Sequence, residues 1–254
     1  MITARKRQTS LFLILMFHLT AAAAGQGLYL TVRVGDEVSL SCGNVKYARN
    51  NCESIIWLSV YNSKVAASTL FETGQIHKDA AAKSDRLSVT ADCSLVIKKV
   101  SVEDAGQYIC RQFINGKQQG PDSFVLLSVV NMVQQNQKDK ILLICSVMEL
   151  GYCRHTVEWL KEGTEEKFSD QEKSGQSCSA TVTFPASVRN SESNLPPVLK
   201  CKVTHSYTNK VQLFDFRLQS SGGRTDSTST TTKQATIKTI TTTQPPTTKS
   251  TTRK

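Results

Sequence analysis

The sequence predicts an all-β protein made of two disulfide-bonded β-sandwiches in tandem, followed by a disordered C-terminal stalk. Apolar residues occur in short runs with a period of two, and no long helical period is present. One set of cysteine and tryptophan landmarks occurs twice along the chain. The last 30 residues are rich in threonine and poor in apolar residues. A chain of 254 residues has room for two domains of ordinary size and a remainder.

Residues 1–24 have the features of a signal peptide. Arg5, Lys6 and Arg7 form a basic patch, an apolar run follows from Leu11 to Leu19, and small residues at 22–24 precede Gly25. The apolar run is much shorter than the roughly 20 residues that span a bilayer. We therefore expect cleavage and entry into the secretory pathway.

Residues 25–130 are expected to form the first domain. Leu28, Leu30 and Val32 alternate with other residues, and a turn at Gly35-Asp36 leads into a second alternating run that ends at Cys42. Further short strands are predicted at Ile55–Val60, Leu87–Val89, Leu95–Ile97, Tyr108–Cys110 and Phe124–Val130. Short strands at this spacing are typical of a sandwich.

Residues 131–219 are expected to repeat the same plan in a second domain. The polar run from Asn131 to Lys140 is predicted to be a hinge. The landmarks of the first domain are Cys42, Cys52, Trp57, Cys93 and Cys110, and they correspond in order to Cys145, Cys153, Trp159, Cys178 and Cys201.

Residues 220–254 are predicted to be a disordered stalk. The 30 residues from Thr225 contain 14 Thr and three Ser. The few apolar side chains cannot offset an ordering cost of roughly 1 to 2 kcal/mol per residue. Such a segment in an exported chain favours O-glycosylation, with an unmodified linker as the alternative.

The segment Asp104-Ala-Gly106-Gln-Tyr108-Ile-Cys110 resembles the corresponding motif of immunoglobulin variable-type domains. The resemblance implies that Trp57 packs on the bridge between the sheets and that the Tyr108 hydroxyl satisfies backbone as a tyrosine corner. It also implies a pair between Arg86 and Asp104. Gly106 is expected to allow the tight turn before the strand.

The second domain is similar to the shorter constant type. Its outer cysteines, Cys145 and Cys201, are 56 residues apart, against 68 in the first domain, and Cys201-Lys-Val-Thr-His205 resembles a constant-type strand. No Phe-Gly-x-Gly segment follows Cys110, which argues against a rearranged antigen-receptor chain. The whole resembles two-domain, immune-type cell-surface receptors of the immunoglobulin superfamily, and a protein ligand is implied by that analogy.

The resemblance also implies how the eight cysteines pair. The bridges between sheets are expected at Cys42–Cys110 and Cys145–Cys201. If pairing stays within domains, the additional bridges are Cys52–Cys93 and Cys153–Cys178. Cys52 follows the second strand of the family fold, so its bridge is expected to steady a loop at the ligand-facing end, or simply to stabilise the domain.

The sequence argues against an enzyme, a metalloprotein and a nucleic-acid-binding protein. No catalytic motif, cofactor motif or metal-ligand spacing is present, and no small-molecule substrate is indicated. The formal charge of +10 resides mostly in the signal peptide and the stalk, so the two domains are nearly neutral. No N-glycosylation sequon is present, which leaves sugar to the stalk.

The candidate partner-binding residues are Phe113, Ile114, Asn115 and Gly116, in the loop from Arg111 to Pro121. An apolar pair beside a glycine turn suits a rigid binding anchor, although an ordinary hairpin has the same pattern. The chain is expected to be a cell-surface ectodomain without its membrane anchor, or a secreted protein. A homophilic adhesion protein and a secreted decoy without signalling remain the alternatives.

Overall fold

The computed structural model describes residues 28–43, 45, 50–61, 66–161, 166–168, 170–174, 178–190 and 198–217. The expected signal peptide and stalk lie outside these residues. The described residues divide into two compact units, 28–129 with 149–151, and 130–148 with 152–217. Both are built from strands and short 3₁₀ turns, which confirms the all-β sandwich prediction. No helix in this part of the chain is long and apolar enough to cross a membrane.

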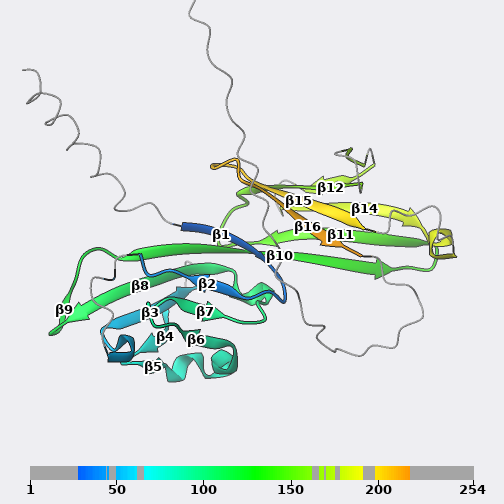
Figure 1. The fold of residues 1–254 in the computed structure, drawn as a ribbon. Helices are drawn as coiled ribbons and strands as arrows, with labels where there is room; N and C mark the ends of the chain where they lie inside the picture. Colours follow the sequence, from blue (N-terminus) through cyan, green and yellow to red (C-terminus); the bar gives the residue numbers. More distant parts are fainter. Residues whose placement is uncertain are drawn as a thin grey trace, which may run out of the picture. The chain divides into compact units, whose positions relative to one another are not determined.

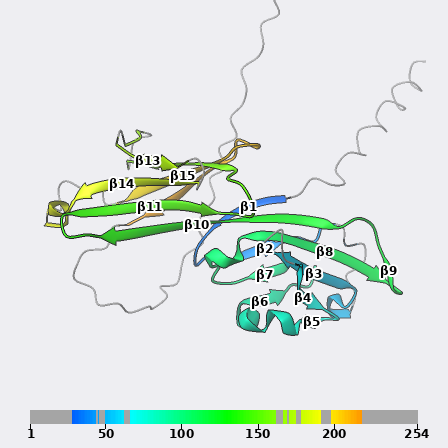
Figure 2. The ribbon, with the colours of Figure 1, turned by 180° about the vertical axis from the view of Figure 1, so that it is seen from behind.

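The first unit contains a larger sheet, which we call the front sheet (Figure 1). Its strands lie in the order β1 (Leu28–Arg33), β10 (Ser123–Asn136), β8 (Gly106–Ile114), β3 (Ile55–Val60), β4 (Ser68–Glu72) and β5 (Gln75–Ile76), with β9 (Lys117–Gln118) paired to the end of β8. The β8–β9 hairpin projects beyond the rest of the unit in both views (Figures 1 and 2).

A three-stranded back sheet closes the first sandwich. It consists of β2 (Val38–Leu40), β7 (Leu95–Ile97) and β6 (Leu87–Val89). The first unit also contains three 3₁₀ segments, η1 (Asn50–Cys52), η2 (Lys78–Arg86) and η3 (Val102–Asp104). Trp57 is fully buried between the sheets, beside the Cys42–Cys110 disulfide in the same core cluster. Its indole N–H donates to the Cys93 carbonyl at 3.0 Å, so the largest core side chain has no unsatisfied polar atom.

The second unit is a sandwich of its own. One sheet holds β13 (Glu172–Ser174), β14 (Ser179–Pro185), β11 (Lys140–Met148) and the end of β10, and the other holds β12 (His155–Leu160), β15 (Leu199–His205) and β16 (Val211–Phe216). A 3₁₀ turn, η4 (Ala186–Asn190), follows β14. Trp159 is fully buried and donates to the Ala180 carbonyl at 3.0 Å.

The polar run predicted to be a hinge is mostly strand. β10 continues to Asn136 and β11 begins at Lys140, which leaves three residues between them. The part of β10 from Val130 onward belongs to the second unit, in whose sheet β10 pairs with β11. The run is therefore strand rather than loop, although the division between the two units falls at Val130, one residue before it.

Gly106 serves a close backbone approach rather than a turn. It is the first residue of β8, and a Cβ built on it would lie 2.8 Å from the Val60 carbonyl oxygen of β3. Two residues on, the buried Tyr108 hydroxyl donates to the Asp104 carbonyl at 2.7 Å. Burial raises the pKa of Tyr108 well above its ordinary value, so this donor keeps its proton. The tyrosine-corner geometry therefore holds the turn, and glycine allows the strands to meet.

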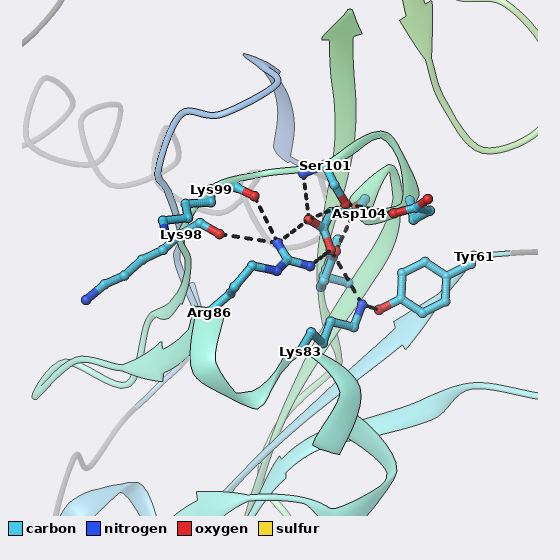
Figure 3. A network of polar contacts seen from close by, with 9 residues as sticks. Tyr61, Lys83, Arg86, Lys98, Lys99, Ser101 and Asp104 are labelled. Carbon is cyan, nitrogen blue, oxygen red and sulfur yellow. Dashed lines mark hydrogen bonds and ion pairs between the residues drawn. The ribbon is translucent and has the colours of Figure 1, made fainter. Parts of the chain in front are cut away.

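Arg86 and Asp104 form the centre of a polar network in the first unit (Figure 3). The guanidinium contacts both carboxylate oxygens of Asp104, at 2.7 and 3.2 Å, and also donates to the carbonyls of Lys98 and Lys99. The Ser101 N–H donates to the same carboxylate at 2.9 Å. Asp104 is only 1% exposed, so these donors replace the water that it loses on folding.

Lys83 adds a second cation to this network. Its ammonium lies 3.6 Å from Asp104 and also donates to the Tyr61 hydroxyl (Figure 3). Burial acts to raise the pKa of Asp104, but the hydrogen bonds from Arg86 and Ser101 and the two positive charges outweigh it, and the pKa lies below its ordinary value.

Acid should therefore destabilise the first unit through Asp104. An unfolded aspartate has a pKa of about 3.9, and the folded value is lower, so the stabilisation is complete above about pH 5 and is lost as the pH falls through the folded value. Denaturant unfolding between pH 2 and neutrality measures this loss. In the Asp104→Asn variant, the part of this acid-induced loss of unfolding free energy that is due to Asp104 should disappear. An equal acid loss in the wild type and in Asp104→Asn would contradict the assignment.

Candidate binding surface

The outer surface of the front sheet is unusually apolar. On β3, Ile55, Trp57 and Ser59 point into the core, so the alternate residues Ile56, Leu58 and Val60 lie on the outside. On β8 and β10, the core positions are occupied by Tyr108, Cys110, Val125 and Leu127. The outward positions between them carry Ile109, Phe124 and Leu126.

The outward residues lie opposite one another across three strands. Ile109 pairs with Leu58 on one side and with Phe124 on the other. Gln107 is flanked in the same way by Val60 and Leu126. We call the six apolar residues the front face: Ile56, Leu58, Val60, Ile109, Phe124 and Leu126. Neighbouring side chains bury Ile109 to 8% exposure, whereas Phe124 is 36% exposed. A contiguous apolar patch of this kind marks an interaction surface more often than scattered apolar residues do.

The β8–β9 hairpin extends from one end of the front face. Its turn residues Asn115 and Gly116 both have left-handed φ angles, of 50° and 73°. This is the geometry of a type I′ turn, which Asn-Gly adopts with little strain and which matches the twist of the strands. Phe113 pairs with Gln118, and Ile114 with Lys117. The predicted binding residues are therefore a hairpin: Phe113 and Ile114 are half-buried strand residues, and Asn115 and Gly116 are exposed at the tip.

An ion pair fixes the base of this hairpin. Arg111 donates from Nε and Nη2 to the two carboxylate oxygens of Asp122, each at 2.9 Å. Gln118 donates to the same carboxylate at 2.8 Å. The hydrogen bond to Asp122 raises the pKa of Arg111, so the guanidinium keeps its charge. The bidentate geometry joins the two sides of the hairpin and limits its motion relative to the sheet.

The loop before β3 is tied to the same region. Cys52 is joined to Cys93, and the Phe113 N–H donates to the Ser54 carbonyl at 2.8 Å. Gln112 is buried, and its side-chain amide donates to the Ser54 hydroxyl at 3.4 Å. The disulfide, the loop and the hairpin are thus connected through short covalent and hydrogen-bonded links. A preorganised surface of this kind loses less entropy on binding.

The remaining predicted residues occupy structural positions. The four disulfides are Cys42–Cys110, Cys52–Cys93, Cys145–Cys201 and Cys153–Cys178, the same pairs that were named from the sequence. Trp57, Trp159, Asp104 and Tyr108 are buried, and Arg86 reaches Asp104 from the surface. None of these residues belongs to the front face.

The sequence interpretation did not identify the front face. The available signal was the run Ile55-Ile-Trp-Leu-Ser-Val60, which has apolar residues at both odd and even positions. In an antiparallel strand with one solvent-exposed face, apolar and polar residues should alternate. The segment Phe124-Val-Leu-Leu127 has the same property. Strands that are apolar on both faces indicate a sheet with a second surface to cover.

Comparison with known proteins agrees with the architecture of the first unit. Residues 26–130 match the family model of the immunoglobulin V-set domain. Among curated proteins, none matches the chain. The match identifies the first unit as a V-set immunoglobulin domain; such domains in general bind other proteins and typically have no enzymatic activity. A V-set domain with internal disulfides fits an extracellular or secreted protein.

Proposed function

We propose that this chain is the ectodomain of an immune-type binding protein, which recognises a protein partner through the front face and the β8–β9 hairpin of its first unit. The observation that carries the proposal is the continuity of six outward apolar residues with a rigid, tethered hairpin. An open apolar sheet face suits another protein better than a small molecule, because small ligands require an enclosing cleft. Aromatic residues such as Phe113 and Phe124 are typical anchors of protein interfaces.

In this proposal the second unit and the stalk position the first unit for binding. The second unit, as a constant-type domain, would act as a spacer, and the threonine-rich stalk would hold both units away from a surface. The two domains are nearly neutral, so the partner is recognised by shape and apolar contact rather than by charge. Affinity should therefore change little between low and physiological salt.

The hairpin residues should contribute strongly to binding. Replacing both Phe113 and Ile114 with Ala should weaken binding by about 2 kcal/mol, or about 30-fold in Kd, because buried apolar anchors dominate interface energies. Neither residue belongs to the buried core of the first unit, so the variant should remain folded. The full chain, multimerised as a probe, is screened against cell-surface proteins, and affinities for the protein that it binds are then measured by surface plasmon resonance.

A matched set of variants locates the interface. Phe124→Ala with Leu126→Ala tests the front face, and Leu213→Ala is the control, since Leu213 is 48% exposed on β16 of the second unit. We expect both double variants to weaken binding and the control to leave it unchanged. Unchanged affinity in both double variants, or binding by the second unit alone, would refute the proposal.

A sedimentation measurement on the same variants tests the homophilic alternative. Wild-type self-association that is lost in the Phe124→Ala, Leu126→Ala variant would identify the partner as a second copy of this chain, and the protein as an adhesion molecule. A wild-type monomer that binds a different protein would exclude that alternative.

A further inference from the structure

We propose that the Cys153–Cys178 disulfide is a thiol–disulfide exchange site, at which a low-mass thiol such as glutathione attacks Cys153 and displaces Cys178. This inference concerns the second unit and does not depend on the proposed binding function. It makes one of the four bridges reactive while the other three remain structural.

Access is the first reason. A thiolate must reach a disulfide sulfur for exchange to occur. Seven of the eight cysteines are at most 8% exposed, and Cys153 is the one that is only half-buried. Its partner Cys178 is 3% exposed, so the bridge offers a reagent one side only. Attack is thereby directed to Cys153, and Cys178 becomes the leaving group.

The neighbourhood of the leaving group is the second reason. A ring nitrogen of His155 lies within 4.8 Å of Cys178 Sγ. An imidazolium beside a cysteine stabilises the thiolate, and a better-stabilised thiolate leaves faster. His155 is itself buried and packs against His205 at 5.0 Å between ring centroids, so its ring is held in place.

The backbone and the connectivity favour local opening of this bridge. Cys178 has a left-handed φ of 45°, which is strained for a residue with a side chain. Cys52 and Cys93 are strained in the same way, but both are buried, so strain alone does not select a bridge. The Cys153–Cys178 loop spans 25 residues, the shortest separation of the four. The Cys145–Cys201 bridge, at the centre of the same unit, keeps the sandwich closed after opening.

The exchange step is balanced without any further reactant. The thiol loses its proton to solvent, and its sulfur forms a bond to Cys153 Sγ as the Cys153–Cys178 bond breaks. The electron pair of the broken bond goes to Cys178 Sγ as a thiolate, which takes a proton from the imidazolium form of His155, and the ring then takes a proton from solvent. A second thiol then releases Cys153 and leaves as the oxidised dimer of the reagent, so two thiols are oxidised and two cysteines reduced.

The test uses the full folded chain in graded reduced glutathione without denaturant. At intervals the exchange is stopped with acid, the chain is unfolded so that buried thiols can be blocked, and labelled and glutathione-bearing cysteines are mapped by mass spectrometry. We expect Cys178 to be labelled first and the glutathione adduct to form on Cys153, while the other three bridges remain intact. An adduct mainly on Cys178, or simultaneous opening of several bridges, would overturn the proposal.

A matched pair of histidine variants tests the role of His155. His155 and His205 are both buried and face one another in the β12–β15 ladder, so His155→Asn and His205→Asn disturb similar packing. We expect His155→Asn to slow exchange at least about tenfold, since a positioned proton donor contributes that much or more. His205→Asn should slow it far less. Equal slowing in both variants would show that His155 only contributes to packing and would contradict the proposed proton transfer. If a variant fails to fold, the position of the glutathione adduct on the wild-type chain still tests the site.

Discussion

Replacing Asp104 with Ala should lower the free energy of unfolding of the first unit by about 4 kcal/mol, the largest effect expected of any single change considered for this protein. The carboxylate is 1% exposed and accepts from the Arg86 guanidinium and from the Ser101 N–H. Without the carboxylate, the Arg86 guanidinium keeps only the carbonyl oxygens of Lys98 and Lys99 as acceptors, and the Ser101 N–H loses its acceptor. An uncompensated charge in a poorly solvated site is more costly than the intact pair is stabilising.

Graded substitutions separate charge from packing at this position. Asp104→Asn keeps the shape and one acceptor, and should cost about 2 kcal/mol. Asp122→Ala removes a carboxylate from a more exposed Arg pair and should cost less than about 1 kcal/mol. Hydrogen exchange followed on peptides from each unit gives these energies separately for the first unit. Equal effects of Asp104→Ala and Asp122→Ala would show that burial of the network is unimportant.

Replacing Gly106 with Ala should destabilise the first unit by about 3 kcal/mol, near the upper end of what overpacking costs. The new methyl group would lie 2.8 Å from the Val60 carbonyl oxygen and 3.3 Å from a ring carbon of Tyr61. The first of these atoms is backbone, so it cannot rotate away. β3 and β8 must separate instead, and these strands carry Trp57 and Cys110, which face one another in the ladder.

Gly43→Ala is the control for this prediction. A Cβ at Gly43 would meet only the Ser123 hydroxyl, at 3.3 Å, and that side chain can adopt another rotamer at the loss of one exposed hydrogen bond, which it accepts from the Gly43 N–H at 3.2 Å. The expected effect is below about 1 kcal/mol, because reduced freedom of the unfolded chain offsets the contact. Thermal unfolding of the two variants gives the comparison. If Gly106→Ala were as stable as Gly43→Ala, the close approach of β3 and β8 would not be what selects glycine.

Local patterns were sufficient for some features and insufficient for others, as Gly106 and the β8–β9 hairpin illustrate. The motif around Tyr108 indicated a glycine at position 106, but the reason assigned was a turn, whereas the contact that requires glycine comes from Val60, which is 46 residues earlier in the chain. The Asn115-Gly116 turn was visible in the sequence because its conformational demand lies within two residues. Whether Phe113 and Ile114 lay in a loop or on strands depended on the pairing with β9 and on the contact with Ser54.

The sequence by itself determined the all-β class and the two-fold use of one plan, since alternation, turn residues and cysteine spacing are properties of short segments. Only the tertiary structure decided which apolar residues are left over once the core is full. Ile56, Leu58, Phe124 and Leu126 are as apolar as their core neighbours, and they became a surface because β3, β8 and β10 present their other faces to the back sheet. The same holds for Cys153, whose accessibility compared with the seven other cysteines depends on the packing around it.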